Sequence, residues 1–229
     1  VVHSLTKFVN GTSDCVAGCV VSSHDFIARL NDINAGPSML LGPVLDSTRA
    51  ASILKNLHSL HIRLRQHGAN ALHVASRLEA LGHAVHYPGL ASHPHHDLLA
   101  RLMNPGYGCG GMLTLDAGDL AAANRLMTLM QRDKVGYLAV SLGYFKTLFN
   151  TPGHSTSSEI PPDERAAAGL REGLIRFSIG LDEDIAQTTE RIESCLAEAE
   201  VRPAGVDGRV SGGGATVDGR SAGQPAGSL

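Results

Sequence analysis

The chain lacks three features that would each define a class of protein: a long apolar run, a basic surplus and a cysteine framework. No run of apolar residues approaches the ~20 that a membrane-spanning helix needs, so we expect no membrane segment. The net charge of −3, with no evident basic face, argues against a nucleic-acid partner. Membrane proteins and nucleic-acid-binding proteins are therefore both disfavoured.

The four cysteines form no recognisable disulfide or zinc pattern. Cys15 and Cys19 are spaced Cys-x-x-x-Cys, but no second pair follows, and Cys109 and Cys195 stand alone. Structural zinc sites usually combine four ligands at close spacings. Small buried thiols in a reducing compartment are the simpler interpretation. Because no secretory leader is recognisable either, we predict a cytoplasmic protein.

Histidines gather in one short segment, at His86, His93, His95 and His96. A His-x-His-His run can bind a transition metal when it lies on a rigid strand. Here Pro94 interrupts the run, and helix-forming residues follow it. We favour a surface turn and predict no metal site.

The composition, with a hydrophobic fraction of 43% over 229 residues, is typical of one or two globular domains. Apolar spacing predicts strands at 14–23, 84–87, 137–140 and 174–181, and helices at 24–30, 46–81, 119–130 and 182–199. Residues 34–42 are expected to form a loop, because they are rich in glycine, proline and serine.

The longest helical pattern begins at Asp46, a good N-cap, and stops before Gly82. One continuous helix over these residues would be about 54 Å long, which is long for a single layer. We therefore expect a break near Gly68, where one domain passes to the next. Arg63 is interpreted as part of the solvated face of this helix.

The strand at 174–181 gives Arg176 a defined direction. Ile175, Phe177 and Ile179 share one face at a period of two, and that apolar face has to be buried. Arg176 then lies on the opposite face, where its guanidinium can present two donors to a carboxylate. The alternative is a solvated arginine on an edge strand.

The segment 4–14 combines two hydroxyls, a lysine and a turn. Ser4 and Thr6 lie at i and i+2, on one side of an extended chain, where both can donate hydrogen bonds to a phosphate. Lys7 follows directly, and Asn10-Gly11 supplies a turn. This pattern alone also fits a surface loop with an ordinary solvated lysine.

Four stretches, in this order, resemble the pyridoxal-phosphate enzymes of cysteine and methionine metabolism: Ser4-x-Thr6-Lys7 with the following Phe8 and Gly-x-x-Asp, then 86–90, 141–143 and 173–180. The resemblance implies an α/β fold of the aspartate-aminotransferase-like type, fold type I. It assigns 1–65 to the C-terminal part of the large cofactor-binding domain and 66–200 to the small C-terminal α/β domain. Residues 201–229, rich in glycine, alanine and serine, are expected to be a disordered tail.

The resemblance also implies site residues. Lys7 is the Schiff-base lysine of pyridoxal 5'-phosphate, and Ser4 and Thr6 hold the cofactor phosphate. Arg176 binds the α-carboxylate of the substrate, and Ser141 completes the same pocket. In this family the residues that stack on the cofactor and pair with its pyridine nitrogen precede the lysine, so we interpret the chain as a C-terminal fragment.

Within the family, the stretches 141–144, 155–159 and 165–169 are most similar to the plant-type methionine γ-lyase branch. This implies a carbon–sulfur lyase that splits a small sulfur amino acid into a 2-oxo acid, ammonia and a thiol. It also implies a homo-oligomer, a dimer of dimers. A cystathionine γ-synthase or O-acyl-homoserine sulfhydrylase of the same family, or a non-catalytic truncated remnant, remain alternatives.

Overall fold

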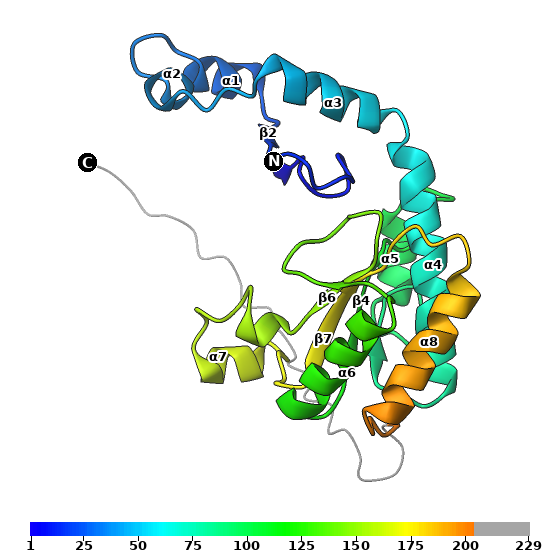
Figure 1. Cartoon of the computed structure of the whole chain (residues 1–229). Helices are drawn as coiled ribbons and strands as arrows, with labels where there is room; N and C mark the ends of the chain where they lie inside the picture. Colours follow the sequence, from blue (N-terminus) through cyan, green and yellow to red (C-terminus); the bar gives the residue numbers. More distant parts are fainter. Residues whose placement is uncertain (204–229) are drawn as a thin grey trace.

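The computed structural model describes residues 1–203, and Figure 1 shows how its elements follow one another. The first 57 residues form an extended N-terminal part. A two-stranded antiparallel ribbon, β1 (Val2–Ser4) and β2 (Gly18–Val20), is followed by α1 (His24–Leu30), α2 (Pro37–Leu41) and α3 (Ser47–Leu57). The remaining described residues form a sheet with helices packed on it.

The sheet has five strands in the order β3-β4-β7-β6-β5. In chain order these are β3 (Val85–His86), β4 (Met112–Asp116), β5 (Tyr137–Leu138), β6 (Leu148–Asn150) and β7 (Leu174–Ser178). β5 and β6 are parallel, and the other neighbouring pairs are antiparallel. β7 is therefore the central strand, and Arg176 does not lie on an edge.

Three helices cover one face of the sheet: α4 (Leu60–Ala80), α6 (Leu120–Arg132) and α8 (Ile185–Glu198) (Figure 1). Ile175 and Phe177 of β7 meet Leu78, Leu126 and Ile192 of these helices in one core, and all five are fully buried. The shorter elements are α5 (His96–Leu102), the 3₁₀ turn η1 (Pro152–His154) and α7 (Pro162–Ala167). The predicted helical and strand faces thus meet in a single hydrophobic layer.

The long helical pattern breaks earlier than the sequence predicts. α3 ends at Leu57 and α4 begins at Leu60, so the predicted break near Gly68 is wrong. Gly68 lies inside α4, where an added Cβ would come within 3.3 Å of the carbonyl oxygen of Tyr107. The glycine permits a close approach of the loop before β4 rather than a hinge. A domain boundary at 65/66 stays a prediction.

The N-terminal part differs from its prediction in two places. The expected buried strand at 14–23 is reduced to β2, and Val16 and Val21 are 86% and 60% exposed. These valines remain exposed because the ribbon has only two strands, and little else in the described part of the chain covers them. The expected loop at 34–42 contains α2, which Pro37 starts at its first position.

At the other end, Val201 is buried in the main core, whereas the sequence predicts that it belongs to the disordered tail. The ordered fold therefore extends at least one residue further than predicted. The rest of the predicted tail, from residue 204 on, lies outside the described residues. Among residues 1–203 no helix combines the length and the apolar character needed to cross a membrane.

Candidate active site

Lys7 lies on a tight turn that follows β1. The amide of Leu5 donates to the carbonyl oxygen of Ala17 at 2.9 Å, which ties the entry of the turn to the neighbouring strand. The amide of Gly11 donates back to the carbonyl oxygen of Lys7 at 2.7 Å, and Gly11 has a φ of +75°. Glycine adopts this left-handed conformation at little cost, so the predicted Asn-Gly turn closes around the lysine.

Arg63 of α4 holds the backbone just after Lys7. Its Nη1 donates to the carbonyl oxygen of Phe8 at 2.6 Å, and its Nη2 donates to that of Val9 at 2.9 Å. Its Nε donates to Ser59 Oγ at 3.1 Å, and burial lowers the pKa of the guanidinium. The interpretation of Arg63 as solvated is therefore wrong, because this half-buried side chain binds the lysine turn.

A loop at 141–147 packs between the lysine turn and β7. The amide of Gly143 donates to Ser178 Oγ at 2.9 Å, and the amide of Phe145 donates to the carbonyl oxygen of Gly11 at 3.2 Å. Gly143 has a φ of +74°, and an added Cβ would lie 2.5 Å from the backbone nitrogen of Phe8. Only glycine allows this close approach.

Lys7, Ser141 and Arg176 come together although they are far apart in the sequence. Lys7 Nζ donates to Ser141 Oγ at 2.9 Å, and Arg176 Nη2 donates to the carbonyl oxygen of Ser141 at 3.2 Å. Arg176 is half-buried, and desolvation lowers its pKa. Within residues 1–203 no carboxylate lies within ion-pair distance of it. The guanidinium is thus a cation with donors available to an anion.

Asn150 is a polar neighbour of Arg176 that the sequence analysis missed. The two residues are opposite each other in the β6–β7 register, so their side chains share a face of the sheet. Asn150 is 3% exposed, and its amide donates to Ser155 Oγ. Its Oδ1 finds no partner in the described part of the chain. No periodicity could reveal it, because all three residues of β6 are buried.

The two predicted phosphate ligands, Thr6 and Ser4, lie in different surroundings. Thr6 Oγ1 accepts from the amide of Ala17 at 2.9 Å and donates to its carbonyl oxygen at 3.2 Å. Ser4 is exposed in β1, opposite Gly18. Thr6 therefore lies at the site with a hydroxyl that is already engaged, whereas Ser4 lies outside it; both roles stay predictions.

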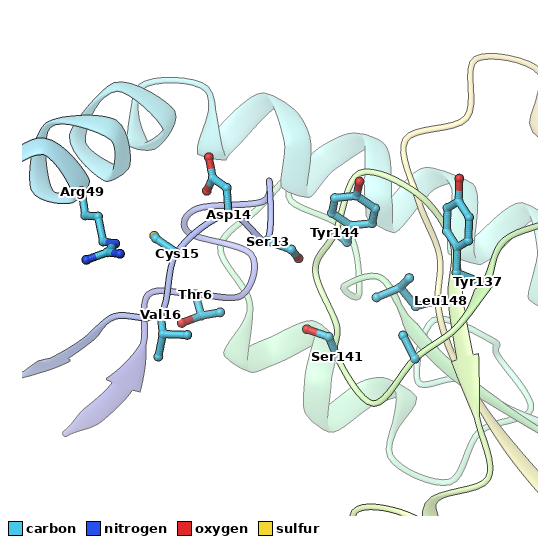
Figure 2. Close-up of a pocket in the computed structure, with 11 residues that line it drawn as sticks. Thr6, Ser13, Asp14, Cys15, Val16, Arg49, Tyr137, Ser141, Tyr144 and Leu148 are labelled. Atoms are coloured by element: carbon cyan, nitrogen blue, oxygen red, sulfur yellow. The ribbon is translucent and has the colours of Figure 1, made fainter.

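A pocket of about 900 Å³ has Thr6 and Ser141 in its lining, and Lys7 and Arg176 lie next to these two residues but not in the lining itself (Figure 2). Its lining comes from the N-terminal part on one side and from the segment 137–148 on the other: Thr6, Ser13–Val16 and Arg49, and Tyr137, Ala139, Ser141, Tyr144 and Leu148. Figure 2 shows the hydroxyl of Ser141 pointing across the gap towards Thr6. The lysine turn and the 141–147 loop therefore border one cavity that is large enough for a small ligand.

No group of three or more metal-ligating side chains forms anywhere in the described 203 residues, the histidine segment included. His95 precedes α5 and His96 starts it. His96 Nδ1 lies 2.9 Å from the carbonyl oxygen of Pro88, a contact that ties α5 to the turn after β3.

Comparison with solved structures defines the class of fold. The chain superposes on cystathionine γ-synthase from Xanthomonas oryzae with a TM-score of 0.77 and 33% identity, covering 87% of this chain and 50% of that one. It superposes on cystathionine γ-lyase from yeast with a TM-score of 0.75 and 30% identity. The predicted class, an α/β structure of pyridoxal-phosphate fold type I, is confirmed.

Sequence comparison defines the family. The profile of the Cys/Met metabolism PLP-dependent enzymes matches residues 1–197, so the chain belongs to this family. Methionine γ-lyase of Arabidopsis thaliana is 41% identical over 181 residues, which are 79% of this chain and 41% of that protein. L-methionine γ-lyase of Pseudomonas putida is 36% identical over 199 residues, 86% and 48% of the two chains. The chain spans about half the length of the curated relatives it matches.

The described residues offer some, but not all, of the groups that would bind pyridoxal phosphate and an amino acid. Covalent attachment needs a primary amine, and Lys7 supplies one beside a serine hydroxyl. The carboxylate of an amino acid needs a fixed cation, and Arg176 is one whose donors are not taken by a carboxylate of residues 1–203. For the phosphate the described chain offers the Thr6 hydroxyl, which would first have to release Ala17.

Proposed function

We propose that this chain carries the cofactor lysine and the carboxylate-binding arginine of a pyridoxal-phosphate-dependent carbon–sulfur lyase. The observation that carries the proposal is the convergence of Lys7 and Arg176 on Ser141. The 41% identity to methionine γ-lyase of Arabidopsis thaliana supports an elimination that yields a 2-oxo acid, ammonia and a thiol from a small sulfur amino acid.

In this proposal Arg176 binds the α-carboxylate of the substrate through two parallel N–H donors. Ser141 keeps the two side chains at their separation, since its hydroxyl accepts from Lys7 and its carbonyl oxygen accepts from Arg176. The amine of Lys7 attaches the cofactor and, once free, takes and returns a proton at the substrate Cα. Pyridoxal phosphate supplies the electron sink that makes this Cα–H bond acidic.

The direct test is Lys7→Ala in the longest natural protein that contains this chain. Borohydride should fix pyridoxal phosphate to Lys7 in the parent, as read by peptide mass spectrometry, and Lys7→Ala should lose both this label and the release of 2-oxo acid. Lys146→Ala is the matched control, because Lys146 is exposed in the neighbouring loop and should keep both. A Lys7→Ala protein that retains both label and turnover would refute the assignment.

A γ-synthase is the second candidate, supported by the TM-score of 0.77 to the synthase from Xanthomonas oryzae. Product analysis separates the two reactions. A lyase releases ammonia and a 2-oxo acid from a sulfur amino acid alone, whereas a synthase or sulfhydrylase with an activated homoserine and a thiol retains the amino group in a new amino acid. A parent protein with no label and no turnover would instead indicate a non-catalytic remnant.

We also propose that the protein acts in the cytoplasm as a homo-oligomer, a dimer of dimers. All four cysteines are free thiols, which is typical of a reducing compartment. The N-terminal part exposes an apolar groove lined by Val21, Leu54 and Leu57 among others, as expected of a surface that another polypeptide covers. Sedimentation velocity on the purified protein tests the assembly, and a monomer at micromolar concentration would refute it.

A further inference from the structure

Three polar side chains of α4, Arg63, His67 and Asn70, follow one another at i, i+4 and i+7. This spacing places them on a single face of the helix. Each one makes hydrogen bonds to the backbone of a segment outside α4. We call these three residues the α4 stripe.

The first end of the α4 stripe holds the lysine turn. Arg63 donates to the carbonyl oxygens of Phe8 and Val9, the two residues that follow Lys7. The same guanidinium also donates to the carbonyl oxygen of Asn56 at 3.0 Å and so ties the end of α3 to the turn. A planar guanidinium with several fixed donors restrains both the position and the orientation of the backbone it binds.

The other end of the α4 stripe holds the chain just after the end of β7, the strand that carries Arg176. Asn70 Nδ2 donates to the carbonyl oxygens of Gly180 at 3.0 Å and Asp182 at 3.1 Å. Its Oδ1 accepts from Gln66 Nε2 at 2.7 Å, so the amide has a fixed orientation. The end of the carboxylate-binding strand is thereby fastened to α4.

His67 lies between the two ends of the α4 stripe and contacts the segments that both ends hold. Its ring is fully buried, with Nδ1 2.6 Å from the carbonyl oxygen of Ile179 and its edge against the ring of Phe8 at 5.2 Å between centroids. A carbonyl oxygen only accepts, so Nδ1 carries the proton and donates. One side chain therefore touches both the residue after Lys7 and the residue that follows the strand of Arg176.

We propose that the α4 stripe positions Lys7 relative to Arg176, so that one amino acid can span from the cofactor-attachment amine to the carboxylate-binding guanidinium. This inference rests on the proposed function of those two residues. The stripe lies within one regular helix of 21 residues, which does not stretch, so it fixes the separation of its two ends. A displacement of ~1 Å between reacting groups is enough to slow a reaction by ~100-fold.

The test uses the longest natural protein that contains this chain, and it separates the two ends of the stripe. Arg63→Lys removes the multiple contacts at the lysine turn, and we expect the concentration of pyridoxal phosphate that half-labels Lys7 under borohydride to rise ~10-fold or more. Asn70→Ala releases the end of β7, and we expect labelling of Lys7 to stay normal while KM for the amino acid rises ~10-fold or more. Asn70→Ser, which can keep one donor, should recover part of this loss.

Arg77→Ala is the matched control on the same helix. Arg77 makes an exposed ion pair with Glu193 of α8, with Nε 2.6 Å from Oε1, and it does not contact the site. We expect it to change the thermal midpoint without changing labelling or KM.

The outcomes are distinguishable. Labelling and KM that change together in every variant, in proportion to the loss of thermal stability, would show a purely structural role and overturn the positioning inference alone. So would labelling and KM that stay unchanged in Arg63→Lys and Asn70→Ala. A parent protein whose Lys7 is not labelled at all would overturn the proposed function, and the positioning inference with it.

Discussion

The substitution Arg176→Lys tests the proposed carboxylate site most sharply. It keeps the positive charge and removes the planar two-donor geometry, so the loss measures geometry and not net charge. Hydrogen bonds to charged groups contribute about 1.5–3 kcal/mol, and breaking a fully buried charged pair costs about 2–5 kcal/mol. Because Arg176 is only half-buried, the lower range applies, which corresponds to a roughly 10- to 150-fold loss of kcat/KM.

The fold should tolerate this change. Arg176 lies on the face of β7 opposite Ile175 and Phe177, and within residues 1–203 it gives up one hydrogen bond, to the carbonyl oxygen of Ser141. We expect the free energy of unfolding to fall by less than about 1 kcal/mol. Steady-state kinetics, urea unfolding and borohydride labelling of Lys7 on the same preparations provide the three measurements.

Arg171→Lys is the matched control for this experiment. Arg171 is exposed and lies 3.2 Å from Asp116 through Nη1 and Oδ2, so its replacement should change stability by at most ~1 kcal/mol and leave kcat/KM unaltered. If Arg176→Lys loses stability or cofactor labelling but retains kcat/KM, then Arg176 is structural and the carboxylate binds elsewhere.

Two further predictions concern the packing around the lysine turn. Gly143→Ala should lower the thermal midpoint more than Gly106→Ala does. Both substitutions cost about 1–2 kcal/mol because an alanine is placed at a left-handed φ, but only the new Cβ at position 143 meets Phe8. Equal losses in the two variants would refute this contact. Burial lowers the pKa of His67 in the folded state. As the pH falls below about 6.5, the unfolded chain therefore binds more protons at this histidine than the folded chain does. Stability should therefore be full above that pH and decrease on acidification. Urea midpoints at about pH 7.5 and about pH 5.5 should differ less in His67→Gln, and an unchanged difference would contradict this.

The sequence predicts an element correctly where the residues of that element alone determine it. Asp119 accepts from the amide of Ala122 at 2.8 Å and starts α6 as predicted, because a capping carboxylate acts within one turn of its own helix. The direction of Arg176 followed from strand alternation for the same reason. The fold class and the family, both predicted from short motifs, are confirmed by the comparisons.

Contacts between segments that are distant in the sequence could not be predicted from local patterns. Arg63 carries the periodicity of a solvated helix face, yet it meets backbone that lies 54 and 55 residues earlier in the chain. The sequence predicts the break between α3 and α4 at Gly68, whereas this glycine is needed for a close approach to residues 107–109. In each case the role of the residue depends on which segment packs against it, and helical spacing does not encode that.

The contacts at Ser141 differ in how they respond to genetic change. Arg176 binds a main-chain carbonyl oxygen, an acceptor that every amino acid supplies, so a codon change at position 141 does not remove it. Lys7 binds the side-chain hydroxyl, which many single-nucleotide changes at this codon would remove. Inherited variation at position 141 can therefore alter the surroundings of the amine while conserving the partner of the guanidinium, and the two halves of the site can evolve separately.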